Sequence, residues 1–123
     1  MDNLTIALQI LIALGIVNVW VVRFGKPSAW RGGAATNMKE EFAAYGLPPW
    51  AIGVTGALKL LCAAGLVVGL WEPALVQPAA ALLAALMVGA IFMHIKVSDP
   101  FSRSLPALLM FAGCLTVFTA LNA

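Results

Sequence analysis

Long apolar runs alternate with polar connectors of unequal length along this chain. The runs cover Leu4–Val22, Ala51–Leu70, Ala74–Ile95 and Leu105–Leu121. Each has about 17 to 22 residues, and a helix needs roughly 20 to cross the hydrocarbon core of a bilayer. The pattern therefore predicts an all-α fold, an integral membrane four-helix bundle formed by one domain over residues 1–123.

The connector between the first two runs contains a short amphipathic stretch. Asn37 and Glu40 have the spacing of a capping box, in which Asn37 caps the helix and Glu40 reaches back. Three larger side chains then repeat on one helical face: Met38, Phe42 and Tyr45. Gly46 is a typical helix stop. The sequence predicts a short interfacial helix over Met38–Tyr45, with Glu40 and Glu41 on its solvated face.

The composition indicates that the lipid bilayer is the main partner of this chain. Of its 123 residues, 63% are hydrophobic and 10% are charged, and the mean hydropathy is +1.00. A soluble domain usually carries about 25% charged residues. The net charge of +2 is too small to indicate a nucleic-acid-binding protein. A homo-oligomer and a partner membrane or redox protein stay open as further interactions.

Basic residues outside the apolar runs lie in only two of the three connectors. The first and third connectors hold all of them: Arg23, Lys26, Arg31, Lys39, Lys96 and Arg103. The positive-inside rule then places loops 23–49 and 96–104 in the cytoplasm and both termini outside. Because the basic residues follow the first run rather than precede it, we expect a retained span and not a signal peptide. The predicted location is a multi-pass position in the cell inner membrane.

Lys59 stands near the middle of the second apolar run. A charge at the bilayer centre costs roughly 2.5–3.5 kcal/mol on insertion scales, so it should face a bundle interior, a cavity or a partner. The residue lies about 14 Å into the span, too deep to reach the cytoplasmic surface easily. We expect a polar pocket in which Lys59 binds an anion or oxygen ligand or transfers protons. The alternative is a structural role, with the charge satisfied by carbonyls and hydroxyls.

His94 is the only histidine and lies near the end of the third run. Imidazole titrates near neutral pH and can pass protons, so His94 joins Lys59 as a candidate catalytic residue. An interfacial histidine bonded to a loop carbonyl is the alternative. The residues expected to line the pocket lie on the faces or at the levels of these two side chains: Asn18, Gly56, Lys59, Cys62, Met87, Ala90 and His94.

No motif in the sequence indicates a metal site. A single histidine cannot form a bis-His haem site within the chain, and the sequence has no CxxC or HExxH pattern. Cys62 and Cys114 both fall inside apolar runs, where packed thiols are expected rather than a disulfide. The cofactor therefore stays unknown at this point.

Glycines and tryptophans are interpreted structurally. Gly65 and Gly69 form a GxxxG pair, and Gly53 and Gly56 extend this small-residue surface, which favours close helix approach within the bundle. All tryptophans lie near predicted span ends, the position of an interfacial aromatic belt: Trp20, Trp30, Trp50 and Trp71.

Four segments together resemble the DoxX-like family of small membrane proteins. They are Phe42–Pro48, Gly53–Leu60, Met87–His94 and Lys96–Asp99. The resemblance covers nearly the whole chain and implies a single DoxX-like transmembrane domain in a bacterial-type inner membrane. The family takes its name from a membrane subunit of a thiosulfate:quinone oxidoreductase, so the resemblance suggests a quinone as the ligand.

Three functions follow as hypotheses. The first is an accessory subunit of a quinone-linked or other membrane redox system, with a polar intramembrane pocket. The second is an intramembrane isomerase or cyclase on a lipophilic substrate, in which Lys59 and His94 perform acid–base chemistry. The third is a membrane assembly factor without a small ligand.

Overall fold

The computed structural model describes residues 2–120, and the regular structure of this part of the chain is entirely helical. Four helices are long and apolar enough to cross a membrane. They are α1 (Asn3–Val17) with the π-helical turn η1 (Asn18–Val22), α3 (Pro49–Val68), η2 (Pro73–Leu75) with α4 (Val76–Lys96), and η3 (Phe101–Ser104) with α5 (Leu105–Ala120). A short helix, α2 (Met38–Ala44), lies in the first connector. The predicted all-α membrane bundle is confirmed.

The spans differ from the predicted runs only at their ends. α3 begins at Pro49, because proline fits the first helical turn, where its missing N–H is harmless. It ends at Val68, so Gly69 and Leu70 belong to the following turn. Leu121, the predicted end of the last span, lies outside the described residues.

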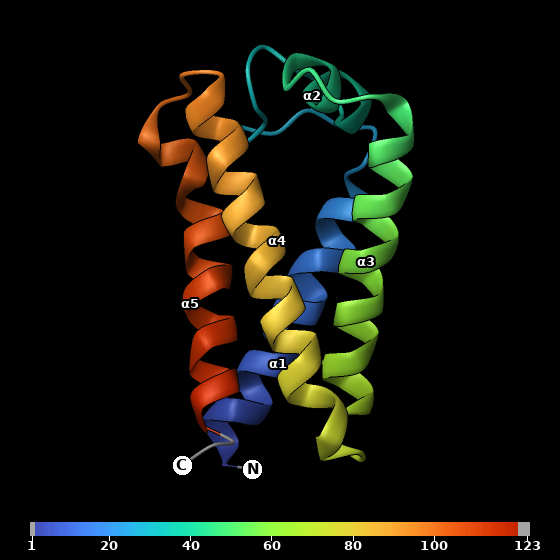
Figure 1. The fold of residues 1–123 in the computed structure, drawn as a ribbon, viewed down its shortest axis with the longest axis vertical. Coiled ribbons are helices and arrows are strands. Elements are labelled where there is room, and N and C mark those ends of the chain that lie inside the picture. The colour runs from blue at the N-terminus through green and yellow to red at the C-terminus, as the bar shows by residue number, and fades with distance from the viewer. Residues whose placement is uncertain (1, 121–123) are drawn as a thin grey trace.

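The four long helices form one bundle in which each contacts two neighbours, in the order α1, α3, α4, α5. Figure 1 shows α2 lying across one end of this bundle, with both chain ends at the opposite end. α2 contacts α3 directly, and its Met38 and Phe42 belong to the same buried cluster as the bundle core. The first connector therefore closes one end of the bundle.

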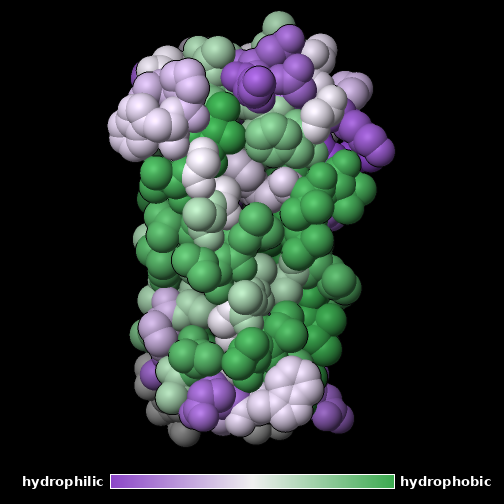
Figure 2. Space-filling view, turned by 90° about the vertical axis from the view of Figure 1, so that its right-hand side faces the viewer, coloured by the Kyte–Doolittle hydropathy of each residue, from purple (hydrophilic) through white to green (hydrophobic). Residues whose placement is uncertain are grey.

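The outer surface of the bundle is apolar at mid-height. Figure 2 shows a hydrophobic band around the middle of the visible face, with hydrophilic residues gathered toward its two ends. Large side chains of all four spans point outward, among them Leu11, Leu61, Phe92 and Leu109. Exposed apolar surface of this extent is typical of a protein surrounded by lipid.

The helices pack tightly near the chain termini. A Cβ on Gly65 would lie 3.1 Å from the Cβ of Ala79, and a Cβ on Gly69 would overlap Val76. These contacts agree with the predicted close approach of α3 to the next span. Gln9 is fully buried here, and its side-chain amide donates to the backbone oxygen of Leu66 at 2.9 Å.

The predicted connector helix is present, with one error in its cap. The Asn37 side chain accepts a hydrogen bond from the Glu40 backbone N–H at 2.8 Å, as expected. The Glu40 carboxylate, however, accepts from the backbone and hydroxyl of Thr36 rather than from Asn37, because the chain before the cap brings both Thr36 donors to it. Gly46 ends the helix with a φ of +76°, a conformation that favours glycine.

α3 and α4 diverge toward the α2 end of the bundle (Figure 1). The π-helical turn η1 continues α1, and its Trp20 is buried between α1 and α3. A Cβ on Gly56 would lie 2.8 Å from the Trp20 ring, so this glycine makes room for the indole. A Cβ on Gly53, in contrast, would have no neighbouring atom within 4 Å among residues 2–120, and the prediction that Gly53 extends the packing surface is wrong.

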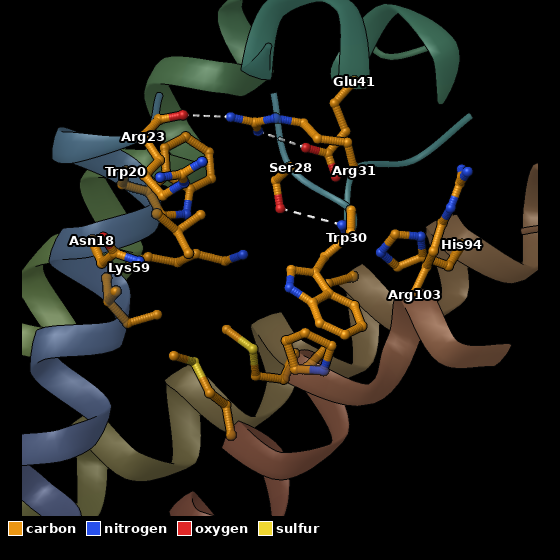
Figure 3. A pocket seen from close by; sticks show the side chains of 18 residues that line it. Asn18, Trp20, Arg23, Ser28, Trp30, Arg31, Glu41, Lys59, His94 and Arg103 are labelled. Atoms are coloured by element: carbon orange, nitrogen blue, oxygen red, sulfur yellow. Dashed lines mark hydrogen bonds and ion pairs between the residues drawn. The ribbon is translucent and has the colours of Figure 1, made fainter. Parts of the chain in front are cut away.

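The expected aromatic belt holds for only part of the tryptophans. Trp50 and Trp71 are 70% and 78% exposed, as interfacial anchors should be. Trp20 is only 8% exposed, because the helical register of α1 turns it into the bundle after Ile16. Trp30 lies in the connector and leans over the space between the spans (Figure 3).

Candidate functional site

A cavity of about 440 Å³ lies between the spans, directly beneath the first connector (Figure 3). Its walls come from η1, α3, α4, the start of α5 and the connector. Five of the seven residues predicted to line a pocket line this cavity: Asn18, Lys59, Met87, Ala90 and His94. The structure therefore brings together side chains from the first three spans that the sequence grouped.

The other two predicted residues do not line the cavity. Cys62 is buried in the core one turn from Lys59, on a face that packs against neighbouring helices. Gly56 is covered by the Trp20 ring. Both residues were predicted to line the pocket because of their helical spacing from Lys59. That spacing does not reveal that the Trp20 indole is inserted between α1 and α3.

The Lys59 side chain points into the cavity in Figure 3. Its ammonium lies 5.4 Å from the centroid of the Trp20 ring, within the range of a cation–π contact. Among residues 2–120 it has no hydrogen-bond acceptor and no carboxylate within ion-pair distance. A charge at this depth with donors to spare is suited to an oxygen atom of a ligand.

A second cavity of about 270 Å³ adjoins the first, between α2, α3 and α4. Six residues line both cavities: Val19, Trp20, Glu41, Lys59, Ala90 and His94. Lys59 and Trp20 therefore stand at the boundary between the two spaces, where each can face either side.

Arg31 and Glu41 form a buried ion pair above the larger cavity (Figure 3). The Arg31 guanidinium donates to Glu41 at 2.9 Å and to the backbone oxygen of Arg23 at 2.6 Å. It also donates to the backbone oxygens of Phe24 and Lys26. Because one side chain satisfies several loop carbonyls at once, it fixes the connector over the cavity.

Tyr45 completes this arrangement. Its hydroxyl donates to Glu41 at 2.8 Å, and its backbone oxygen accepts from the Lys96 ammonium at 2.8 Å. Burial, and then the nearby Glu41 charge, raise the pKa of the Tyr45 phenol above its ordinary value of 10.0. The phenol therefore stays a hydrogen-bond donor over the physiological pH range. We call Arg31, Glu41 and Tyr45 the roof.

His94 is paired with a carboxylate rather than with a loop carbonyl. Its Nδ1 lies 2.7 Å from the Asp99 carboxylate, and both side chains are less than 10% exposed. The ring also meets Tyr45 edge-on, with centroids 5.9 Å apart. Because Nδ1 faces Asp99, the pair sets the orientation of the imidazole at the cavity wall.

Asp99 also holds the connector. It accepts from the backbone N–H of Gly33 at 3.0 Å and from Arg103 at 2.9 Å, and Arg103 in turn donates to the Gly33 oxygen. Burial disfavours the charge of Asp99, but the bonds from His94 and Gly33 and the nearby Arg103 outweigh it. The pKa of Asp99 therefore lies below its ordinary value of 3.8.

The turn before Asp99 is held in an uncommon backbone conformation. Ser98 has a φ of +58°, in the left-handed region that favours glycine. The backbone N–H of Asp99 then donates to the backbone oxygen of His94 at 3.0 Å. Backbone strain of this kind persists where surrounding contacts hold it in place. Here the strained turn brings Asp99 back beside His94 at the end of α4.

Several site residues were missed or misplaced by the sequence. Glu41 was expected on a solvated face, but its side chain is only 12% exposed, since it pairs with Arg31. Glu40, which was expected on the same face, is exposed. From the sequence, Arg31 was interpreted only as one of the basic residues of the first connector. Asp99 was named only as the last residue of a segment that resembles the DoxX-like family. The available signal for Asp99 was an acidic residue five positions after the only histidine.

The cavity combines an apolar floor with polar groups above it. Ile16, Met87 and Met110 supply apolar surface, while Lys59 and His94 supply polar atoms. Within residues 2–120, no group of three or more His, Cys, Asp or Glu side chains is placed to hold a metal ion. Cys62 and Cys114 are buried free thiols. The arrangement is suited to binding a small amphiphile and orienting it by one or two hydrogen bonds.

Comparison with known protein families places the chain in one of them. The model of a family described as the DoxX-like family matches residues 7–118. No curated protein and no solved structure matches the chain. The matched range includes all the residues placed around the two cavities, and the predicted resemblance is confirmed.

Proposed function

Because this chain belongs to the DoxX-like family, we propose that it is an accessory subunit of a quinone-linked or other redox system in the bacterial-type inner membrane. In this role the larger cavity holds the head of a lipophilic molecule. The observation that carries the proposal is the Lys59 ammonium, which lines the cavity without an acceptor among residues 2–120.

The dimensions and chemistry of the cavity support a quinone-like ligand. Its volume of about 440 Å³ falls within the range of small-molecule sites, which are mostly apolar with a few placed polar groups. A quinone head is flat and apolar at its faces and has carbonyl oxygens at its edges. Lys59 would donate to one carbonyl, and the apolar floor with Met87 and Met110 would contact the ring.

The same proposal includes an orientation in the membrane. Six of the seven Lys and Arg residues lie at the α2 end, in the first and third connectors or at the helix ends beside them, while Asp2 and Glu72 lie toward the other end. By the positive-inside rule the roof faces the cytoplasm, and both termini face outward. Reporter fusions at each terminus test this orientation, and reporters that are active in the cytoplasm at both ends would contradict it.

An intramembrane isomerase or cyclase is the second candidate, favoured by one specific contact. Asp99 orients His94, and His94 lines the same cavity as Lys59, so a bound substrate would meet two groups able to transfer protons. A membrane assembly factor, acting through a partner protein or a second copy, is the third candidate. Turnover of a lipophilic substrate by the purified chain alone would favour the enzyme.

Binding of decyl-ubiquinone to the purified protein in detergent, measured by calorimetry, tests the first proposal. We expect Lys59→Met to weaken binding about tenfold or more, because a hydrogen bond from a charged donor is worth about 1.5–3 kcal/mol. Lys39→Met is the matched control, since Lys39 is exposed on α2 and lines neither cavity. Equal affinities for the two variants, or no binding by the wild-type protein, would contradict the proposal.

A further inference from the structure

The smaller cavity reaches the lipid-facing side of α4. Successive residues on a helix are 100° apart, so Gly89 lies about 200° from the buried Met87, nearly opposite it. Gly89 and Ala85 are both exposed and both line the smaller cavity. This cavity is therefore a groove that extends outward between α3 and α4, whereas Met87 lines only the larger cavity.

The groove opens at the depth of the hydrocarbon. Gly89 is seven residues before Lys96, the last residue of α4, which corresponds to about 10 Å along the helix. The hydrocarbon core of a bilayer is about 30 Å thick. At this depth the outer end of the groove meets acyl chains rather than water or head groups.

The lining of the groove is suited to a flexible hydrocarbon chain. Apolar side chains from α2, its C-terminal turn and α4 dominate it, among them Met38, Phe42, Leu47, Leu86 and Met93. Methionine side chains adapt to irregular apolar shapes. Of the polar groups at its upper end, Glu41 and Tyr45 are bonded to each other, and His94 is paired with Asp99.

The groove is continuous with the head site at Lys59. Six residues border both cavities, and the boundary consists of the Lys59 stem and the Trp20 ring. A molecule whose head accepts a hydrogen bond from Lys59 therefore has its next atoms at the inner end of the groove.

From these four observations we infer that the two cavities form one site for a single-tailed amphiphile, whose head lies against Lys59 and whose hydrocarbon tail leaves between α3 and α4 into the bilayer. This inference rests on the proposed function and specifies the class of its ligand: a polyprenyl or alkyl quinone rather than a tailless head. It also specifies the route, which is lateral entry from the membrane.

Two glycine variants separate the groove from the rest of the surface. A Cβ on Gly89 or on Gly53 has no protein atom within 4 Å among residues 2–120, so leucine fits at both positions. Gly89→Leu fills the groove, whereas Gly53→Leu lies away from both cavities. Both changes remove a mid-helix glycine, so neither is expected to prevent folding.

The binding test compares decyl-ubiquinone with the tailless ubiquinone head in these variants. We expect Gly89→Leu to weaken binding of the decyl compound about tenfold, because the blocked tail displaces the head from Lys59. Its affinity for the tailless head, and both affinities of Gly53→Leu, should equal those of the wild-type protein. Unchanged binding of the decyl compound by Gly89→Leu would overturn the inference.

A second measurement distinguishes a wrong tail route from a wrong head group. In a variant that keeps Trp20 as its only tryptophan, an alkyl chain brominated on the carbons next to its hydroxyl head and placed in the groove should quench Trp20 fluorescence, because Trp20 borders the inner end of the groove. The probe is a brominated fatty alcohol, which needs no quinone head. Quenching that Gly89→Leu reduces and Gly53→Leu does not would support the tail route even if no quinone binds. Equal quenching in all three proteins would overturn it.

Discussion

The same four apolar helices form both ends of the bundle, but the side chains that lie between the helices differ from one end to the other. Near the termini, Leu66, Val76, Ala80 and Val117 have no exposed surface. The helices meet there through small residues such as Gly65. We call this region the closed end. Close approach leaves no space for a ligand and excludes lipid from the core.

Beneath α2 the same helices are separated by large and charged side chains. Trp20 stands between α1 and α3, and Lys59 and His94 point into the resulting space. We call this region the open end. The roof and Asp99 supply hydrogen bonds that replace the missing helix contacts. At the open end, polar bonds of the connector therefore add to the apolar packing of Trp20, Met38 and Phe42 around the space.

The two ends also differ in how completely a buried polar side chain is hydrogen-bonded. At the closed end, Gln9 donates to Leu66, and its side-chain oxygen has no partner among residues 2–120. At the open end, Arg31 bonds to three carbonyls and a carboxylate. The donors of Arg31 have acceptors, whereas the Lys59 ammonium has none among residues 2–120. The proposed role of Lys59 in ligand binding rests on this difference.

The largest effect is expected from breaking the roof with Arg31→Met. Removing one partner of a buried ion pair leaves an uncompensated charge and typically costs about 3–5 kcal/mol, so the free energy of unfolding should fall by about 3 kcal/mol. Denaturation of the purified protein in mixed micelles measures it. Lys39→Met, on the exposed face of α2, is the control and should be close to wild type. Equal stability of the two variants would show that the roof does not hold the open end.

The next largest effect concerns helix approach at the closed end. In Gly69→Leu the new side chain would overlap Val76 and lie against the backbone oxygen of Gly65. Overpacking of this kind typically costs about 1–3 kcal/mol. Gly53→Leu has open space and should keep the thermal unfolding temperature of the wild-type protein. If Gly69→Leu unfolds at the same temperature as Gly53→Leu, the closed end is not tightly packed.

The closed end and the overall fold could be predicted from sequence because they depend on periodic features. The length of each apolar run predicts a membrane span, and the spacing of Gly65 and Gly69 predicts the contact of α3 with the next span. The cap at Asn37 and the stop at Gly46 are local signals and identified α2. Each of these features depends on residues that are neighbours in the chain.

The open end could be predicted only in part. Lys59, His94 and Met87 were found because a charge or a titratable group inside an apolar run must face inward. Within the roof, Glu41 and Tyr45 are four residues apart, but Arg31 lies ten residues before Glu41, and no periodicity links those two. Trp20 looked like an interfacial anchor, because its inward direction depends on the register of α1 and on the glycine opposite it.

A smaller effect is expected from titrating the bond between the connector and α4. Because the folded pKa of Asp99 lies below 3.8, its contribution is complete above that pH and is lost as the pH falls through the lower folded value. The unfolding temperature of the wild-type protein should therefore drop on acidification below 3.8. Asp99→Asn should be less stable at neutral pH and show a smaller drop. The control is Glu40→Gln, which changes an exposed carboxylate bonded to Thr36.

The smallest change in stability is expected for Lys59→Met, although it removes a charge from the centre of a span. Lys59 has no ion-pair partner among residues 2–120, so its loss leaves no opposite charge unpaired. Replacing a buried charge with an apolar side chain of similar length is often neutral or stabilising, and we expect a change between zero and a gain of about 1 kcal/mol. Denaturation in mixed micelles measures this change beside Arg31→Met. A loss as large as that of Arg31→Met would mean that Lys59 supports the open end structurally, and its role as a ligand-binding group would then lose its main argument.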